Sequence, residues 1–330
     1  LEIRLITSKR NPSTPFFFQK RMTFFSSSRT LGFSQFRSGC FLSNTCKYHF
    51  PREGTYSQAE PRNLDFQLVG GVSGAPSMKK KYFFFDIDRT LGLDITSIIP
   101  TDTLYCLRQL QRRGHFISIA SGRLQCDAQQ FADRYGVPAV VSDGGNSFSL
   151  NGSVIEMKGL PLENCKALLH ELDERQLPWA VVTDNTIYRY TPYDTFPHAD
   201  RRNYMKTVVR PVDIDALTAV YKITYVRPDD EKNEPDKHQL PHLTYLDHTY
   251  LVEPTDKSIG ILRMLNYIGG SPEDTVVFGD GLNDISMFRK PFFSVAMGNA
   301  KPELKARADY ITDDNDKGGI LHACMKFGWI

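Results

Sequence analysis

Over most of this chain, short apolar runs alternate with amphipathic segments of helical length, and this alternation constrains the fold more than any other feature. The runs Tyr82–Phe85, Phe116–Ala120 and Val137–Ser142 predict buried strands. Residues 101–113 and 125–135 have the apolar spacing of helices, and a glycine follows each. Strands and helices in this order predict βαβ units. We therefore expect an α/β fold with a doubly wound, Rossmann-type parallel sheet.

The middle of the chain departs from this alternation. Residues 145–158 predict a hairpin that turns at Asn151-Gly152, a pair that favours a type I′ turn. A helix is predicted over Leu162–Arg175. Strand-like stretches follow it at Trp179–Asp184, Thr186–Tyr190, Tyr221–Val226 and Leu243–Glu253. This mixture predicts a separate α+β module.

The strand–helix alternation then resumes near the C-terminus. Helices are predicted at Ser258–Tyr267, Ile285–Arg289 and Pro302–Ala308, and strands at Thr275–Phe278, Phe293–Met297 and Tyr310–Thr312. We therefore predict a core in two parts, residues 79–159 and 251–330. An α+β cap is inserted between them at residues 160–250.

Residues 1–78 have a different composition from the rest. They are rich in Ser, Arg, Phe and Gly, and they contain ten Lys/Arg but only four Asp/Glu. Such a composition is typical of organelle transit peptides. It also suits a poorly ordered N-terminal extension, or upstream sequence ahead of a protein that starts near Met78. We favour these last two interpretations over a transit peptide, and the segment shows neither helical nor strand periodicity.

The charge and cysteine content narrow the function. After residue 78 the chain has 30 Lys/Arg and 34 Asp/Glu, and this mildly acidic balance argues against nucleic acid as a partner. No apolar run reaches the roughly 20 residues of a membrane-spanning helix, so we expect no membrane association. The six cysteines are scattered without a C-x-x-C pair. They predict neither disulfides nor a zinc site, which favours a cytoplasmic location.

Two clusters of reactive side chains follow the first two predicted strands. Asp86 and Asp88 come directly after Tyr82–Phe85, and on an extended backbone they point in different directions. One carboxylate can attack an electrophile while the other transfers a proton, although a strand-end aspartate can also be a simple cap. Ser121 and Gly122 follow the second strand, where they offer an anion a hydroxyl and backbone N–H groups, or serve as an ordinary helix cap.

Two further clusters lie after the cap. Lys257 begins a predicted helix, where the helix dipole disfavours a cation unless the lysine faces carboxylates or a phosphate. Asp280, Asn283 and Asp284 lie in a glycine-containing turn after the strand Thr275–Phe278. Two acids and an amide suit a hard cation such as Mg²⁺, and a turn with Asx caps is the alternative. Carboxyl ends of parallel strands share one sheet edge, so we expect these clusters to meet.

The combination of these clusters resembles the haloacid dehalogenase (HAD) superfamily. The resemblance rests on four motifs: D-x-D-x-T at residues 86–90, Ser121 after the second strand, Lys257, and G-D-G-L-N-D at residues 279–284. The chain is similar to the Cof-type sugar-phosphate phosphatases, whose α/β cap lies between the second and third clusters. The segments 294–300 and 308–312 add to this similarity, which covers residues 79–330.

The resemblance implies an Mg²⁺-dependent phosphatase that forms an aspartyl-phosphate intermediate. It implies that Asp86 is the nucleophile and Asp88 the general acid–base. Further implied roles are phosphate binding by Ser121, Gly122, Lys257 and Asn283, and metal binding by Asp86, the Asp88 carbonyl and Asp280, with Asp284 behind them. We expect small phosphorylated metabolites as substrates, either sugar or cofactor phosphates. We also expect a monomer or a weak homodimer.

Two departures from the family pattern bear on the substrate. Arg89 stands where this branch usually has glycine, and Asp143 stands where it usually has asparagine. In the cap, aromatic and basic residues could bind a sugar or a flat cofactor: Trp179, Tyr188, Arg189, Tyr190, Tyr193, Arg201 and Arg202. Alternative functions are a phosphomutase of the same superfamily, a catalytically silent phospho-ligand sensor and, last, a receiver-type signalling module.

Overall fold

A computed structural model describes residues 79–330 apart from 95–97, 197–203, 231–232 and 247. The predicted N-terminal extension, residues 1–78, lies outside the described residues, as do Arg201 and Arg202. None of the helices described is both long enough and apolar enough to cross a membrane.

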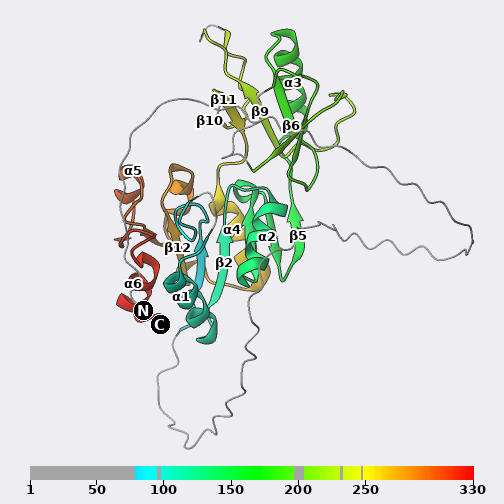
Figure 1. Cartoon of the computed structure of the whole chain (residues 1–330). Coiled ribbons are helices and arrows are strands. Elements are labelled where there is room, and N and C mark those ends of the chain that lie inside the picture. The colour runs from blue at the N-terminus through cyan, green and yellow to red at the C-terminus, as the bar shows by residue number, and fades with distance from the viewer. Residues whose placement is uncertain (1–78, 95–97, 197–203, 231–232, 247) are drawn as a thin grey trace, which may run out of the picture. The chain divides into compact units, whose positions relative to one another are not determined.

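The core is built on an eight-stranded sheet (Figure 1). Six neighbouring strands are parallel, in the order β14 (Tyr310–Ile311), β13 (Phe293–Ala296), β12 (Thr275–Gly279), β1 (Tyr82–Phe85), β2 (Phe116–Ala120) and β3 (Ala139–Ser142). The antiparallel hairpin β4 (Ser147–Leu150) and β5 (Ser153–Met157) completes the sheet. Asn151 and Gly152 turn this hairpin with positive φ angles, as a type I′ pair requires. The α/β class is as predicted.

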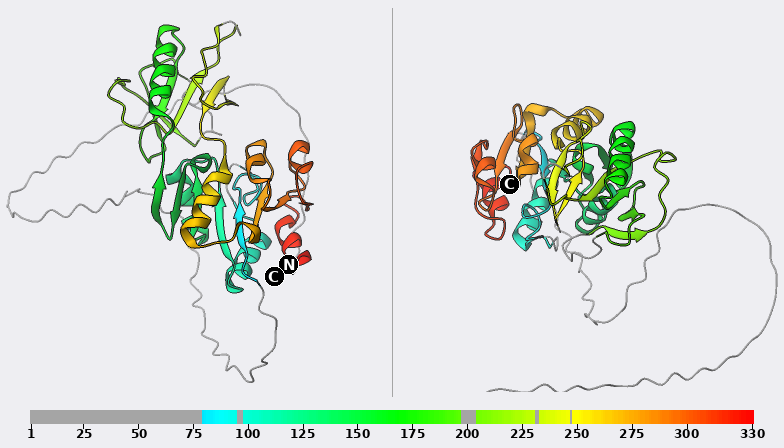
Figure 2. Two further views of the ribbon diagram at one scale, coloured as in Figure 1. Left: turned by 180° about the vertical axis from the view of Figure 1, so that it is seen from behind. Right: turned by 90° about the horizontal axis from the view of Figure 1, so that it is seen from above.

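Helices cover both faces of this sheet. They are α1 (Thr101–Arg112), α2 (Gln125–Tyr135), α4 (Lys257–Ile268), α5 (Pro302–Lys305) and α6 (Gly319–Lys326). Figures 1 and 2 show α2 on one face and α4 on the other. The central strand β1 is accordingly apolar on both sides, and Phe83, Phe84 and Phe85 are all buried. Burial on both faces explains why this strand is a continuous apolar run.

The inserted part of the chain forms a second, six-stranded sheet. Its order is β10 (His242–Tyr245), β11 (Thr249–Val252), β9 (Lys222–Val226), β6 (Trp179–Val182), β7 (Tyr188–Thr191) and β8 (Lys206–Val209). Helix α3 (Leu162–Glu174) packs on this sheet through Cys165, Leu168, Leu169 and Leu172, which share one cluster with Trp179. We call residues 160–250 the cap and the two flanking parts the core. This second cluster gives the cap a hydrophobic core of its own.

Two element predictions need correction, and two elements were missed. Leu243–Glu253 is not one strand, because it contains two antiparallel strands, β10 and β11, which pair with Tyr245 opposite Thr249. The helix predicted at Ile285–Arg289 is instead a 3₁₀ segment over Leu282–Met287, named η4. Strand β8 and helix α6 were not predicted. Two other 3₁₀ segments, η1 (Asp143–Gly145) and η3 (Pro272–Asp274), lie in the core.

The sheet order brings the reactive clusters to one edge. Strand β1 lies between β12 and β2, and all three run in the same direction. Asp86, Ser121 and Asp280 are each the first residue after one of these strands. They therefore meet at the carboxyl edge of the sheet, where doubly wound folds bind ligands.

Gly260 allows α4 to approach this edge closely. A Cβ atom at Gly260 would lie 2.7 Å from the Gly145 carbonyl oxygen and 2.5 Å from Val141 Cγ1. Helix α4 also carries Lys257 one turn earlier, so its approach sets the position of that lysine. Close packing thus connects a small residue in the helix to the geometry of the edge.

We expect Gly260→Ala to destabilise the protein by about 1–3 kcal/mol, because overpacking against backbone outweighs alanine's better helix propensity. Urea unfolding followed by circular dichroism measures this change. Asn266→Ala, on an exposed face of the same helix, is the control and should be within about 0.5 kcal/mol of the wild type. A Gly260→Ala variant as stable as the wild type would contradict the packing argument.

Candidate active site

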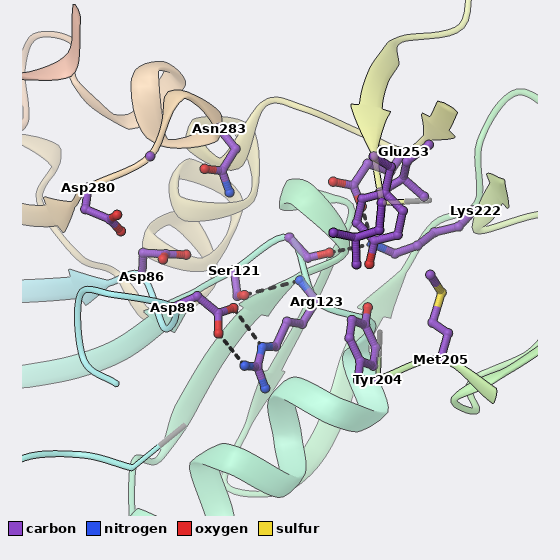
Figure 3. Close-up of a pocket in the computed structure, with 15 residues that line it drawn as sticks. Asp86, Asp88, Ser121, Arg123, Tyr204, Met205, Lys222, Glu253, Asp280 and Asn283 are labelled. Carbon is purple, nitrogen blue, oxygen red and sulfur yellow. Dashed lines mark hydrogen bonds and ion pairs between the residues drawn. The ribbon is translucent and has the colours of Figure 1, made fainter. Parts of the chain in front are cut away.

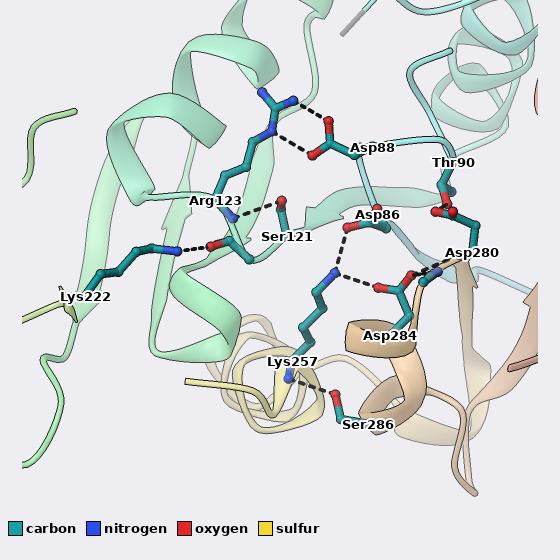
Figure 4. A network of polar contacts seen from close by, with 12 residues as sticks. Asp86, Asp88, Thr90, Ser121, Arg123, Lys222, Lys257, Asp280, Asp284 and Ser286 are labelled. Carbon is teal, nitrogen blue, oxygen red and sulfur yellow. Dashed lines mark hydrogen bonds and ion pairs between the residues drawn. The ribbon is translucent and has the colours of Figure 1, made fainter. Parts of the chain in front are cut away.

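Lys257 bridges two carboxylates at the centre of the site (Figure 4). Its side chain is 1% exposed, and its Nζ atom donates to Asp86 Oδ1 and Asp284 Oδ1, each at 2.6 Å. The Lys257 backbone N–H donates to the Ser286 hydroxyl at 3.0 Å. The two carboxylates offset the cost of placing an ammonium at the first residue of α4.

The turn after β12 is organised around the Asp284 side chain. Asp284 Oδ2 accepts hydrogen bonds from the backbone N–H groups of Asp280 at 2.9 Å and Gly281 at 3.0 Å. The Thr90 hydroxyl donates to Asp280 Oδ1 at 3.1 Å, which links the loop after β1 to this turn. Asp284 thus holds the backbone of the turn while it faces Lys257 with its other oxygen.

The buried charges change the proton affinity of these groups. Burial, followed by repulsion from Asp284, raises the pKa of Asp86 well above its usual value, although Lys257 opposes this shift. Burial, followed by Asp284, raises the pKa of Asp280 to about 6. Burial would lower the pKa of Lys257, but Asp284 and Asp86 reverse this and raise it. Lys257 is therefore charged. The carboxylates around it carry more negative charge than this one ammonium neutralises.

The carboxylates fit a bound cation. One oxygen from each of Asp86, Asp280 and Asp284 lies within 4.8 Å of the other two. Three carboxylates face one ammonium, so a divalent cation would neutralise the excess negative charge, and carboxylate oxygens are ligands that Mg²⁺ prefers. Asp88 was predicted to contribute its backbone carbonyl, and that contribution stays a prediction.

Arg123 holds the side chain of Asp88. Its Nε and Nη2 atoms donate to the two carboxylate oxygens of Asp88 at 2.9 and 2.5 Å, and Nη1 donates to Asp127 at 3.0 Å. The Arg123 backbone N–H donates to Ser121 Oγ at 3.2 Å. Arg123 was not among the residues predicted for the site. Its position directly after two anion-binding candidates was the available signal.

A cavity of about 380 Å³ opens in front of these groups (Figure 3). The core lines it with Asp86, Asp88, Ser121, Gly122, Arg123, Asp280, Gly281 and Asn283. The cap sheet and its loops line it with Tyr204, Met205, Lys222, Tyr245, Leu246 and Leu251, and the segment leading back to the core adds Glu253. Of the predicted site residues, only Lys257 and Asp284 do not line this cavity, because both are buried behind Asp86.

The aromatic and basic cap residues named from the sequence do not line this cavity where the structure describes them. Trp179 is buried in the cap's own cluster, where Tyr193 packs against its ring at 6.1 Å. Arg189 is buried as well and donates to Thr207 at 2.8 Å. Trp179 lies on the face of the cap sheet that packs against α3, whereas Arg189 lies on the opposite face, and Tyr204 and Tyr245 line the cavity instead.

Asp143 lies behind the cavity rather than in it. Its side chain is buried, and the nearby Ser147 hydroxyl and Gln125 N–H only partly oppose the effect of burial on its pKa. Burial raises its pKa to about 6, and the nearby Lys222 opposes that shift. The acid that replaces the family's asparagine is therefore a buried charge at neutral pH, not a substrate-facing group.

Arg89 adopts a left-handed conformation with φ of 61°. Its side chain is 54% exposed, and its Nε atom lies 3.9 Å from Asp280 Oδ2. Such a long and exposed ion pair contributes little to stability. A side chain in this backbone region is strained, which explains why glycine suits the position.

Residues 83–324, most of the chain, match the family model of the haloacid dehalogenase-like hydrolases. The chain belongs to that family. YkrA of Bacillus subtilis (strain 168) is 30% identical over 257 residues, which cover 76% of this chain and 99% of YkrA. Phosphoglycolate phosphatase 1 of Saccharolobus solfataricus is 26% identical and covers 73% of this chain and 92% of its own length.

Solved HAD structures share the whole described fold. A protein from Geobacillus kaustophilus HTA426 has a TM-score of 0.67 and 27% identity, covering 76% of this chain and 100% of its own. The subclass IIB sugar phosphatase BT4131 has a TM-score of 0.62 and 28% identity over the same shares. The Cof-type HAD assignment from the sequence is therefore confirmed, and the chain is an enzyme of the phosphatase type.

We expect Arg89→Gly to stabilise this HAD protein by about 1 kcal/mol, because glycine adopts a positive φ without strain. The free energy of unfolding in urea measures the change. Arg89→Ala is the control. It removes the same charge but keeps a Cβ atom, and it should show no such gain. Equal stabilities of the Gly and Ala variants would contradict the strain argument.

We expect Asp143→Asn to stabilise the protein at neutral pH but not at acidic pH. Because the pKa of Asp143 rises from 3.8 to about 6 on folding, its contribution is fully present below about pH 4 and is lost as pH rises through 6. The variant lacks this loss, so its advantage should grow to at most about 3 kcal/mol by pH 7. The charged or titratable groups facing Asp143 are Lys222, Glu253, Tyr221 and Cys126.

Urea unfolding of both proteins at pH 4, 5, 6 and 7 measures this trend. Asp133→Asn replaces an exposed aspartate on α2 and is the control, for which no growth with pH is expected. A difference between Asp143→Asn and the wild type that stays constant over this range would contradict the prediction.

Proposed function

We propose that this protein is an Mg²⁺-dependent phosphatase that hydrolyses small phosphorylated metabolites through an aspartyl-phosphate on Asp86. The observation that carries the proposal is the environment of Asp86. Lys257 holds one of its oxygens at 2.6 Å, two further carboxylates complete a cation-binding cluster, and a cavity opens in front. The phosphatase relatives support the same reaction class.

In the first step, one oxygen of Asp86 attacks phosphorus and the bond from phosphorus to the ester oxygen breaks. Because Lys257 donates to Oδ1, the attacking atom is Oδ2. The leaving oxygen takes a proton from Asp88, so a neutral alcohol departs and Asp86 carries the phosphoryl group. A bound Mg²⁺ would reduce the repulsion between this carboxylate and the anionic phosphate.

In the second step, Asp88 removes a proton from water as its oxygen attacks phosphorus. The bond from phosphorus to Asp86 breaks, which releases inorganic phosphate and restores both aspartates to their starting protonation states. Ser121, the Gly122 N–H, Lys257 and Asn283 are proposed to bind the phosphoryl oxygens. Three of these four line the cavity, and Lys257 lies directly behind Asp86.

Arg123 must release Asp88 during this cycle. Arg123 donates to both carboxylate oxygens of Asp88, so neither oxygen is open to the leaving group or to water while this pair holds. Arg123 also pairs with Asp127 at 3.0 Å, so it can leave Asp88 without losing every carboxylate partner. Contact between Asp88 and the substrate would therefore accompany a movement of the guanidinium group.

The cavity supports a small substrate. Its volume of about 380 Å³ is at the lower end of the range for metabolite sites. Its cap side is made largely of Tyr204, Met205, Tyr245 and Leu251, which would contact the leaving group rather than the phosphate. The cytoplasmic location and the monomer or weak homodimer stay predictions.

We expect p-nitrophenyl phosphate hydrolysis by the full chain to require Mg²⁺ and to fall at least about 10³-fold in Asp86→Asn, because the amide is not a nucleophile. Phosphate release with Mg²⁺, with EDTA and in the variant measures this. Asp316→Asn, an exposed aspartate, is the matched control and should retain activity. Metal-independent release, or an active Asp86→Asn, would refute the mechanism. With a sugar phosphate as substrate, an isomerised product without free phosphate would favour the mutase.

A further inference from the structure

Three cap side chains bind one short stretch of the core, residues 122–125. Lys222 Nζ donates to the Gly122 carbonyl at 2.6 Å, the Tyr204 hydroxyl accepts from the Leu124 N–H at 3.0 Å, and Asn185 Nδ2 donates to Gln125 Oε1 at 2.7 Å. Each comes from a different segment of the cap. The cap therefore holds the loop that follows β2, which carries the proposed phosphate-binding residues Ser121 and Gly122.

Of these three cap side chains, that of Lys222 is the most deeply buried. Its side chain is 2% exposed, and it forms an ion pair with Glu253, whose side chain is 10% exposed. The same lysine also faces the buried carboxylate of Asp143. Dehydrating an ammonium is costly, so its ion pair and its bond to Gly122 must offset that cost. An apolar side chain would fill this space without the cost of dehydrating a charge. What the lysine adds is its hydrogen bond to the Gly122 carbonyl.

The Lys222–Gly122 bond determines the direction of one peptide group. In a trans peptide the carbonyl and the following N–H point in opposite directions. Because Lys222 binds the Gly122 carbonyl, the N–H of Arg123 points away from the lysine, and it donates to Ser121 Oγ at 3.2 Å. Figure 4 shows this sequence of contacts from Lys222 through the loop to Ser121.

The hydrogen bond from the Arg123 N–H makes the Ser121 hydroxyl a donor towards the cavity. Since Ser121 Oγ already accepts from the Arg123 N–H, its own hydrogen is directed towards another acceptor. Ser121 lines the cavity beside Asp86 and Asp88, so a phosphoryl oxygen there would be that acceptor. The Arg123 side chain continues from the same peptide to Asp88. A rotation of the Gly122–Arg123 peptide would therefore disturb both groups.

We propose that Lys222 is a positioning residue that reaches from the cap to fix the Gly122–Arg123 peptide, and through it the Ser121 hydroxyl, for phosphate binding. The inference rests on the proposed phosphatase function. Lys222 touches no reacting atom, so its effect passes through the loop. The competing view is that Lys222 only stabilises the joint between the cap and the core through Glu253.

A double-mutant cycle separates the two views. In the full chain, Lys222→Met and Ser121→Ala should each lower kcat/KM for p-nitrophenyl phosphate by about 10- to 100-fold, the effect of losing one hydrogen bond to a charged group. If Lys222 acts through Ser121, the double variant should lose little more than either single variant. Lys166→Met is the matched control, because Lys166 also donates to a backbone carbonyl, that of Asp215 within the cap. It should retain full activity.

Independent losses that multiply in the double variant, or an unchanged Lys222→Met, would overturn the proposal. Lys222→Met leaves the Glu253 carboxylate buried without its lysine, so it could also unfold. Lys222→Met combined with Glu253→Gln removes both charges. It should fold by circular dichroism and show the same loss. Full activity in this folded variant would equally overturn the proposal.

Calorimetric titration with inorganic phosphate in Mg²⁺ gives a readout that needs no turnover. We expect Lys222→Met to weaken phosphate binding about tenfold, the size of one lost charged hydrogen bond, whereas Lys166→Met should not. If the wild type hydrolyses no phosphate ester yet binds phosphate in this Lys222-dependent manner, the proposed function fails and the positioning role survives. Equal phosphate affinities of wild type and Lys222→Met would overturn the positioning role alone.

Discussion

The ammonium of Lys257 between Asp86 and Asp284 is the interaction on which the site depends. Without that charge, the carboxylates at this sheet edge would repel one another and would take up protons as their pKa values rise. The lysine also ties three separate parts of the chain together: β1, α4 and the turn after β12. A single buried cation thus sets both the ionisation of the proposed nucleophile and the packing of the elements that carry it.

Much of this arrangement could be predicted because it follows from short-range pattern and sheet topology. An apolar run that ends in Asp86 identifies a buried strand and the residue at its carboxyl end. Once parallel strands are inferred, Asp86, Ser121 and Asp280 must approach one another. The dipole argument for Lys257 also required only its position at a helix start, and the structure places two carboxylates against it.

The cap's contribution could not be predicted in the same way. Strand periodicity says which residues share a face, but not which face meets the core. Trp179 and Arg189 looked suited to ligand binding, yet both are buried and neither lines the cavity, while Lys222 and Tyr204 reach the core. The hairpin of β10 and β11 was mistaken for one strand because alternation continues across a tight turn. Such features depend on tertiary contacts between distant segments.

The joint between cap and core carries an unusual charge balance that bears on how the enzyme would work. Asp143 and Glu253 are two buried acids around one lysine, Lys222. Apolar packing would join the two parts at lower cost. Placing Lys222 there instead couples the cap to the peptide that orients Ser121 and Arg123. A phosphate site completed only when the cap is seated would combine substrate selection with assembly of the catalytic groups.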